Sequence, residues 1–366
     1  MQGGNKPFAV IRLDDLASLQ PGADRPLFSA THEEILTGLT TDVYFLRTLE
    51  VLRREGRDRT PVVAEVFARR PGVMAGMEEA LRLLAHRPRE LGPVQVWALP
   101  DGAEFAAREV VMRIAGPYGA FGIYETALLG ILAHSCGWAT AAREVVQAAG
   151  GKPVLVFGAR HVHPAVSSVM ERAALIGGAT GAASVLGAKL MGKEPAGTTS
   201  HAFMLIMGDT LAAAEAYHRH LGPECPRIML VDTFKDEAEE ALRLADALGE
   251  ALAGVRLDTP GERGGVQPGL VREVRARLDL AGHRHVRILV SGGLTPERVR
   301  ELAEAGADAF GVGSYISAAP PIDMTMDIKQ IEGRPVAKRG RIPGLTPAER
   351  LELRTLDASS SREEGT

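Results

Sequence analysis

Five strand-like segments in the second half of the chain, one made of small residues and four largely apolar, each finish on a polar residue or a glycine turn, and this recurrence limits the possible folds more than any other feature. The segments are residues 196–201, finishing at His201; 227–232, at Asp232; 254–257, followed by Asp258; 286–290, followed by Ser291; and 309–312, followed by Gly313. Apolar strand bodies with polar carboxyl ends are typical of parallel (β/α) barrels, whose active sites lie at that edge. The pattern therefore predicts such a barrel, with the five endings gathered at one site.

Helical segments alternate with these strands from residue 124 onward. A long alanine-rich helix is expected over residues 125–149, closed by two glycines. Further strands are expected at 154–157 and 177–183, and the strand–helix rhythm continues to residue 312. Units of this length favour parallel strands joined by right-handed crossovers. We expect residues 121–320 to form a TIM-like (β/α) barrel, either closed or incomplete.

The segments on either side of this barrel lack the regular alternation of strands and helices. Residues 1–120 mix strands, at 61–67, 94–99 and 110–114, with amphipathic helices, which predicts an N-terminal α/β sandwich domain. Residues 321–356 contain two alternating runs, 324–331 and 336–341, around a glycine turn, and we expect this hairpin to return to the first domain. Residues 357–366 are polar and are expected to be a disordered tail.

Composition excludes several classes of partner. The 366 residues carry a formal net charge of -4, so broad electrostatic capture of nucleic acid or of a membrane surface is not expected. Two cysteines, Cys136 and Cys225, are too few for a disulfide scaffold or a four-cysteine zinc site, which favours a reducing, cytoplasmic compartment. The N-terminus lacks the apolar core of a signal peptide. The most apolar helix candidate is too short to span a bilayer.

Two glycine turns follow the last two barrel strands. Gly292 and Gly293 open a helix, and Gly311 and Gly313 repeat the arrangement one unit later. Glycines let backbone N–H groups approach an anion, and loops at these positions of a barrel commonly bind phosphate. We interpret both as phosphate-binding loops, the alternative being two tight turns.

The polar strand ends supply the other candidate residues. Arg160 could bind an anion in a bidentate manner, and Phe157 offers a face to an aromatic ring. Arg256 and Asp258 are two residues apart, hence on one side of a strand, where they could bind phosphate, sugar hydroxyls or Mg²⁺ or could form a structural ion pair. Asp232 adds a second carboxylate.

Three histidines are candidates for a functional role. His201 follows three hydroxyl residues, Thr198, Thr199 and Ser200, and its place in the recurrent pattern favours chemistry over a role in the core. His161 and His163 have a spacing that could hold a metal, but only with further ligands, and we expect no metal site there.

Seven motifs, taken together, resemble those of nicotinate phosphoribosyltransferases, in the family's order and over about residues 41–341. They are Thr41-Asp-Val-Tyr44, Phe121-Gly-Ile-Tyr-Glu-Thr126, Phe157-Gly-Ala-Arg160, Gly197-Thr-Thr-Ser-His201, Arg256-Leu-Asp258, Ser291-Gly-Gly293 and Gly311-Val-Gly313. The resemblance implies an N-terminal α/β sandwich, a (β/α) barrel and a C-terminal return to the first domain. It also implies a homodimer or higher homo-oligomer with head-to-tail subunits and intersubunit active sites.

The resemblance implies a reaction in the first step of NAD synthesis from nicotinate. Nicotinate and 5-phosphoribosyl pyrophosphate, with Mg²⁺, would give nicotinate mononucleotide and pyrophosphate, with ATP hydrolysis coupled. His201 would be the transiently phosphorylated residue, and Tyr44 of the partner subunit and Phe157 would sandwich the pyridine. Arg256 and Asp258 would hold ribose and phosphates.

The remaining implied roles concern binding. Arg160 would bind pyrophosphate or the ring carboxylate, and the glycine loops would take the 5′-phosphate or its ATP counterpart. Thr180, Ser200 and Asp232 would line the substrate site. The transition state of such a transfer is oxocarbenium-like, so positioning and anion stabilisation matter more than a strong base.

Two departures from related families bear on the substrate. Some short relatives carry a cysteine-rich zinc knuckle near the C-terminus, but no cysteine follows Cys225, so we predict no zinc. Relatives that use nicotinamide carry an aspartate just after a Gly-Thr pair, whereas Thr180 is followed by Gly181, which favours an acid substrate. Quinolinate enzymes lack the phosphorylated histidine and have more lysine and arginine at the site.

Alternative functions remain open from the sequence. The base could be quinolinate or nicotinamide. A protein of another class, a non-catalytic sensor of phosphoribosyl ligands, would not need a phosphorylatable His201. A barrel isomerase or aldolase acting on a sugar phosphate would want a lysine at a strand end, and none of the five segments finishes on one.

Overall fold

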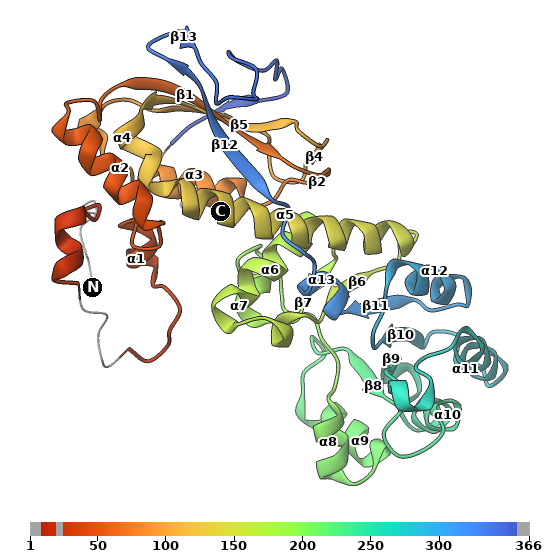
Figure 1. The fold of residues 1–366 in the computed structure, drawn as a ribbon. Coiled ribbons are helices and arrows are strands. Elements are labelled where there is room, and N and C mark those ends of the chain that lie inside the picture. The colour runs from red at the N-terminus through yellow and green to blue at the C-terminus, as the bar shows by residue number, and fades with distance from the viewer. Residues whose placement is uncertain (1–8, 20–24, 357–366) are drawn as a thin grey trace. The chain divides into compact units, whose positions relative to one another are not determined.

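The computed structural model describes residues 9–19 and 25–356. The chain divides into two compact units, one made of residues 1–137 and 320–366 and the other of residues 138–319 (Figure 1). The limit that we expect at residue 120 falls before α5 (Glu125–Ala148), and this helix contributes residues to both units. The tail expected at 357–366 lies outside the described residues.

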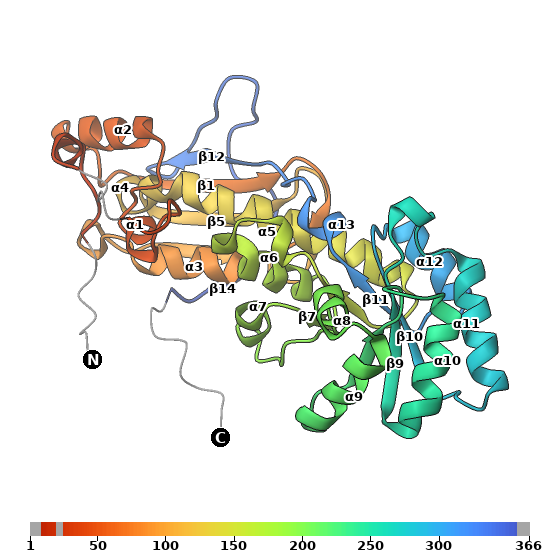
Figure 2. The ribbon, with the colours of Figure 1, turned by 90° about the horizontal axis from the view of Figure 1, so that it is seen from below.

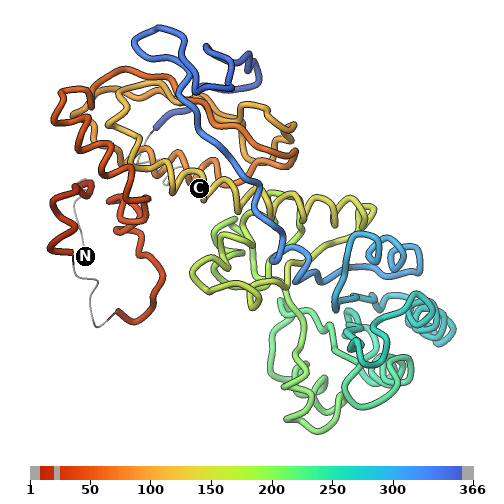
Figure 3. Tube along the Cα trace, viewed as in Figure 1, coloured from red at the N-terminus to blue at the C-terminus, as the bar shows by residue number. Residues whose placement is uncertain are grey.

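The first unit is built on an antiparallel sheet with the strand order β13-β12-β1-β5-β3-β14. Its strands are β1 (Pro61–Ala68), β3 (Gln95–Ala98), β5 (Val110–Pro117), β12 (Met324–Ile331), β13 (Arg334–Pro335) and β14 (Glu352–Arg354). Short strands β2 (Gly72–Val73) and β4 (Glu104–Phe105) form a separate pair. Because β12 and β14 come from the end of the chain, the predicted C-terminal return is confirmed, and Figure 3 lets the reader follow this blue segment along β1.

Helices pack on this antiparallel sheet. The helices are α1 (His32–Leu36), α2 (Val43–Arg54), α3 (Met77–Ala85), α4 (Tyr118–Phe121) and the first half of α5. Leu84 of α3 and Leu128 of α5 share a buried cluster with Ile114 of β5, so both helices pack on the sheet. The predicted hairpin is present, but its second strand is Arg334–Pro335 rather than 336–341.

The second unit contains six parallel strands in the order β7-β6-β11-β10-β9-β8. They are β6 (Val154–Val156), β7 (Gly181–Ala182), β8 (Arg227–Leu230), β9 (Leu252–Leu257), β10 (Arg287–Ser291) and β11 (Ala309–Val312). Helices α6 (Pro164–Ile176), α7 (Val185–Lys189), α8 (His201–Met207), α9 (Thr210–His220), α10 (Glu237–Leu248), α11 (Pro268–Leu280), α12 (Pro296–Glu304) and α13 (Ser314–Ser317) alternate with them. In Figure 2, α10, α11 and α12 lie together on one side of this sheet. The predicted α/β fold class is confirmed, with the barrel in its incomplete form.

The strand expected at residues 196–201 is not formed, and this corrects the sequence prediction. Residues 193–200 are irregular, and His201 begins α8 with Ser200 as its N-cap. The segment nevertheless lies between the two edge strands: the Ala196 N–H donates to the carbonyl oxygen of Ala182 in β7 (2.9 Å), and Thr199 Oγ1 accepts from the N–H of Leu230 in β8 (3.1 Å). An irregular segment thus occupies the position where a further barrel strand would pair.

Among the described residues, no helix combines the length and the apolar character needed to cross a bilayer.

Candidate active site

Polar side chains gather at the carboxyl ends of the parallel strands. Phe157 follows β6, Asp232 lies two residues beyond β8, Asp258 follows β9, and Ser291 closes β10. The strand pairing sets Ser291 level with Gly311 of β11. Because neighbouring parallel strands end at the same edge of the sheet, residues far apart in sequence meet there.

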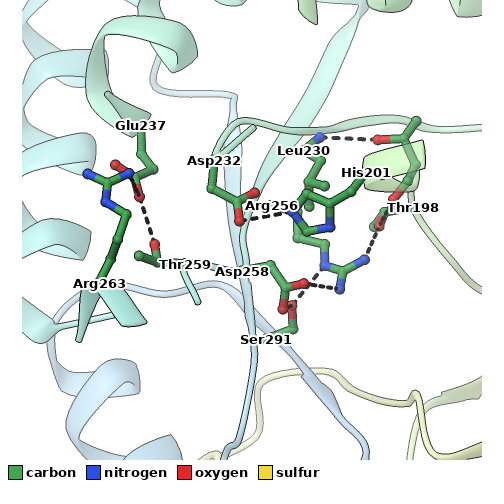
Figure 4. A network of polar contacts seen from close by, with 11 residues as sticks. Thr198, His201, Leu230, Asp232, Glu237, Arg256, Asp258, Thr259, Arg263 and Ser291 are labelled. Carbon is green, nitrogen blue, oxygen red and sulfur yellow. Dashed lines mark hydrogen bonds and ion pairs between the residues drawn. The ribbon is translucent and has the colours of Figure 1, made fainter. Parts of the chain in front are cut away.

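Arg256 is the centre of this arrangement (Figure 4). Its Nε donates to Ser291 Oγ (2.8 Å), and one terminal nitrogen donates to Thr198 Oγ1 (3.0 Å). The other terminal nitrogen lies 3.0 Å from Asp258 Oδ2, and Ser291 Oγ donates to Asp258 Oδ1 (2.6 Å). The side chains of Arg256 and Asp258 are only 14% and 20% exposed, so the ion pair is poorly screened by water. The network holds one cation and one anion side by side at the edge of the sheet.

An aromatic ring lies against the same arginine. The guanidinium carbon of Arg256 is 5.1 Å from the centroid of the Phe157 ring, a cation–π distance. The ring also lies close to Gly311, where an added Cβ would overlap the ring carbons. Glycine at 311 is therefore required by the close approach of Phe157, which leaves the ring at the edge of the sheet.

His201 is held by a buried carboxylate. Its Nε2 lies 3.1 Å from Asp232 Oδ2, and Figure 4 shows the pair beside Arg256. An ionised carboxylate can only accept a hydrogen bond, so Nε2 carries the proton, and in a neutral imidazole Nδ1 then carries the lone pair. The His201 side chain is 43% exposed, whereas that of Asp232 is fully buried. The arrangement presents a nucleophilic nitrogen whose tautomer is fixed from behind.

Burial raises the pKa of Asp232 above its ordinary value. The hydrogen bond from His201 opposes this shift, and the nearby Asp258 adds to it. Among the described residues, Asp232 Oδ1 has no hydrogen-bond partner although it is buried. The carboxylate is therefore poised to gain from any positive charge that develops on the imidazole.

The glycine turn after β10 approaches the carboxylate of Asp258. Gly292 has φ +98°, in the region that disfavours side chains, and an added Cβ would lie 3.2 Å from Asp258 Oδ1. Its neighbour Gly293 has φ +61°, just before α12, whose N-cap is Thr295. Gly313, after β11, packs against the ring of His161. Both predicted phosphate loops thus lie at the carboxyl edge.

Not every predicted site residue joins this cluster. Thr180 lies at the opposite, amino-terminal end of the sheet, where its Oγ1 accepts from the N–H of Val154, the first residue of β6. Ser200 Oγ caps α8 by accepting from Phe203 N–H (3.3 Å). Tyr44 belongs to the other compact unit, as the second residue of α2, and its side chain is 55% exposed.

Sequence reasoning missed a second polar cluster beside the site. The hydroxyl of Thr259 donates to Glu237 Oε1 (2.8 Å), and both residues are buried. A terminal nitrogen of Arg263 lies 3.5 Å from the same oxygen. Figure 4 draws this cluster on the far side of Asp232 from Arg256. The only sequence signal for this cluster was a threonine directly after Asp258. Spacing alone could not identify its partner, Glu237, which lies 22 residues away.

No group of three or more His, Cys, Asp or Glu that could hold a metal ion occurs in the part of the chain that the structure describes.

Comparison with known proteins identifies the family. Residues 42–136 match the quinolinate phosphoribosyl transferase N-terminal domain, and residues 138–327 match the C-terminal domain of the same family. The chain belongs to the quinolinate phosphoribosyltransferase family. It is accordingly a phosphoribosyltransferase of NAD biosynthesis, and the predicted resemblance to pyridine phosphoribosyltransferases is confirmed.

Individual relatives carry different names. The chain is 30% identical to nicotinate phosphoribosyltransferase pncB1 of Mycobacterium tuberculosis, over 82% of its own length and 74% of the relative's. It is 26% identical to human nicotinate-nucleotide pyrophosphorylase [carboxylating], over 76% and 86%. A solved structure named nicotinate-nucleotide pyrophosphorylase, from Pyrococcus furiosus, is 45% identical with a TM-score of 0.82, over 88% and 82%. The family's transferase activity is common to these names, and the pyridine base differs among them.

Proposed function

We propose that this phosphoribosyltransferase uses nicotinate and couples the transfer to ATP hydrolysis through phosphorylation of His201. The observation that carries the proposal is the pair formed by His201 and the buried Asp232. A quinolinate enzyme has no need of a phosphorylated histidine. A histidine whose tautomer is fixed by a buried carboxylate, with its other nitrogen free of protein partners among the described residues, supports the ATP-coupled reaction.

The proposed phosphorylation follows from the charges at this pair. The Nδ1 lone pair of His201 attacks the terminal phosphorus of ATP, the bond to the bridging oxygen breaks, and ADP leaves. The imidazole gains positive charge while its Nε2–H remains bonded to Asp232, whose carboxylate stabilises that charge. Water later hydrolyses the phosphohistidine, which returns His201 and releases phosphate.

The proposed transfer step uses the Arg256 network. The bond between ribose C1 and pyrophosphate breaks as the pyridine nitrogen of nicotinate bonds to C1. Asp258 accepts from ribose hydroxyls, and Arg256 offers positive charge to the phosphates. Phe157 stacks on the pyridine, and Arg160 and the two glycine loops bind phosphate oxygens.

Magnesium is proposed to arrive with the substrates. Mg²⁺ in phosphate-transferring sites is usually held by one or two carboxylates together with substrate phosphates. Asp232 and Asp258 fit this description, and the unpartnered, buried Oδ1 of Asp232 is compatible with such a role. These residues would hold the ion, which neutralises the pyrophosphate charge.

The choice of base is supported by what lies beyond β7. Ala183 and Ser184, at the carboxyl end of this strand, carry no carboxylate that could accept from an amide nitrogen. The neighbouring Glu171 is buried and accepts from the N–H groups of both residues, so it is engaged internally. We infer that nicotinate, whose ring carries a carboxylate, is preferred over nicotinamide. In a site arranged to pair a carboxylate, the amide would leave hydrogen-bond donors of the protein unmatched.

The assembly is proposed to be a homodimer or higher homo-oligomer with shared sites. Tyr44 is exposed in the first unit, while Phe157 and Arg256 lie in the second. If Tyr44 completes a partner's site, mixing Tyr44→Ala and Arg256→Ala proteins should partly restore activity through hybrid sites. Absence of recovery while subunits demonstrably exchange would contradict shared sites.

The substrate is tested with the purified protein, phosphoribosyl pyrophosphate and Mg²⁺. Nicotinate, quinolinate and nicotinamide are supplied in turn, with and without ATP, and nucleotide formation is followed by chromatography. We expect nicotinate to exceed both other bases in kcat/KM by orders of magnitude, and ATP to stimulate only that reaction. Preferred use of quinolinate, with loss of its carboxyl group as CO₂ and no response to ATP, would replace this function by the quinolinate reaction.

A further inference from the structure

We propose that His161 is a positioning residue, which links Arg160 to the segment after β11 and so orients the Arg160 guanidinium toward phosphate oxygens of the phosphoribosyl donor. The two residues lie in the 3-10 turn Ala159–His161 that follows β6. The inference rests on the proposed role of Arg160 as an anion ligand. It adds a second residue that never needs to touch the substrate.

The hydrogen bonds at His161 define one tautomer. Arg160 Nε can only donate, and it lies 3.3 Å from His161 Nε2, so Nε2 must accept. In a neutral imidazole the proton is then on Nδ1, which lies 3.2 Å from Ser317 Oγ and donates to it. The Ser317 hydroxyl can in turn donate to the carbonyl oxygens of Gly313 (3.2 Å) or Ser314 (3.5 Å). The contact with Arg160 thus defines the tautomer, and the contacts of Ser317 are compatible with it.

The residue that anchors the His161 ring, Ser317, lies in a buried and hydrogen-bonded position. Its carbonyl oxygen accepts from the indole nitrogen of Trp138 (3.2 Å). The His161 ring packs on Gly313, where an added Cβ would lie 2.9 Å from ring carbon Cε1. The imidazole is thus held between the turn after β6 and the glycine loop after β11, both at the carboxyl edge of the sheet.

The contact with His161 leaves the terminal guanidinium nitrogens of Arg160 available for a ligand. Its Nε is engaged by His161, while its terminal nitrogens have no hydrogen-bond partner among the residues that the structure describes. Those nitrogens carry four N–H groups, which suit two oxygens of one phosphate. An arginine fixed at Nε loses less rotational freedom on binding, so its affinity for the anion should be higher.

The spacing of His161 and His163 does not make a metal site here. His163 Nδ1 accepts from the N–H of Ala165 and caps α6, whereas His161 faces Ser317. The two rings therefore have different roles: His163 caps a helix, and His161 connects Arg160 with Ser317. In the proposed role, the bond to Ser317 holds the His161 ring and the bond to Arg160 orients the guanidinium.

Two substitutions separate the two hydrogen bonds of His161. His161→Gln can place a carbonyl oxygen near the position of Nε2 and keep the acceptor for Arg160. His161→Asn reaches only the position of Nδ1, so it can keep the contact with Ser317 but not the one with Arg160. His220→Asn, at the exposed end of α9, is the matched control. Affinity for Mg²⁺–phosphoribosyl pyrophosphate is measured by calorimetry without pyridine base, and KM and kcat are measured separately.

We expect His161→Asn to weaken binding of phosphoribosyl pyrophosphate about tenfold, as for loss of one hydrogen bond to a charged group. The KM for this substrate should rise while kcat changes little, and His161→Gln should remain within about threefold of wild type. In an Arg160→Ala background, His161→Asn should have no further effect, because the residue acts through Arg160.

Equal affinity of His161→Asn and wild type would overturn the inference, and so would a full effect in the Arg160→Ala background. Failure of His161→Gln to retain affinity, while the His220→Asn control binds normally, would also count against it. A wild type that binds phosphoribosyl pyrophosphate but uses quinolinate would refute the proposed base and leave the role of His161 standing.

Discussion

Replacing Asp232 by asparagine tests the proposed phosphorylation most directly. The substitution is nearly isosteric, and the asparagine carbonyl can still accept from His201 Nε2, so the orientation of the ring is kept and only the negative charge is lost. A hydrogen bond to a charged group contributes about 1.5–3 kcal/mol and a neutral one about 0.5–1.5 kcal/mol. The lost stabilisation is therefore about 1–2 kcal/mol, which corresponds to about 5- to 30-fold slower phosphorylation of His201.

The assay is transfer of labelled phosphate from the terminal position of ATP to the protein, followed by rapid quenching. The label should be acid-labile and base-stable, and it should be absent from His201→Ala. Asp246→Asn is a matched control, because Asp246 Oδ1 also pairs with a histidine, His283 Nε2 at 2.8 Å, but is 71% exposed. Asp246→Asn should label at the wild-type rate.

The pH dependence of labelling gives a second readout. Burial raises the pKa of Asp232, so acid protonates it at a higher pH than an ordinary aspartate. Wild-type labelling should therefore decline earlier with falling pH than an ordinary aspartate would allow, and Asp232→Asn should lack that component. Labelling of Asp232→Asn at the wild-type rate and with the wild-type pH profile would refute the role of the carboxylate.

Three further predictions concern packing, hydrogen bonding and burial within the two units. Gly311→Ala should displace the Phe157 ring and raise the KM for the pyridine base severalfold, because overpacking costs about 1–3 kcal/mol, while Gly269→Ala, where a Cβ meets open space, should leave steady-state kinetics unchanged. Thr199→Val leaves a buried N–H of β8 unpaired and should lower the free energy of unfolding by about 1–3 kcal/mol in urea denaturation, with Thr199→Ser close to wild type. Burial raises the pKa of Glu125 to about 7 from an ordinary 4.5, so the folded state binds more protons than the unfolded state between these values. The free energy of unfolding should then fall as pH rises from 5 to 7, and Glu125→Gln should remove that slope.

The parallel strands could be predicted because their apolar runs are bounded by clear turn signals. Residues 228–230, 288–290 and 309–312 are buried or partly buried throughout and read as short continuous apolar segments, as helix-covered parallel strands do. Residues 196–200 are small or hydroxyl-bearing, a composition that a strand and an irregular segment share. Thr199 pairs with β8 through its side chain rather than its backbone, and sequence periodicity carries no signal for that choice.

The candidate site was partly accessible to the same reasoning. The spacing of Arg256 and Asp258 predicted one side of a strand, and they do face each other at 3.0 Å. The sequence offered phosphate binding and a structural ion pair as alternatives, but the two are compatible, because the ion pair lies at the edge where substrates would bind. Thr180 is expected at the site from the family resemblance alone, yet β7 begins only at Gly181, so Thr180 stands at the amino-terminal end of that strand.

The pair of His201 and Asp232 illustrates why location can be predicted when local structure is not. Both readings of residues 196–200, strand or irregular segment, connect β7 to β8, and consecutive elements of such folds are usually neighbours in space. The segment therefore lies between the two edge strands in either case, and its last residue emerges beside the end of β8, where Asp232 is. What the sequence could not supply is the direction of the imidazole. That direction depends on α8 beginning at His201, which turns Nε2 toward the buried carboxylate and leaves Nδ1 for the proposed phosphoryl group.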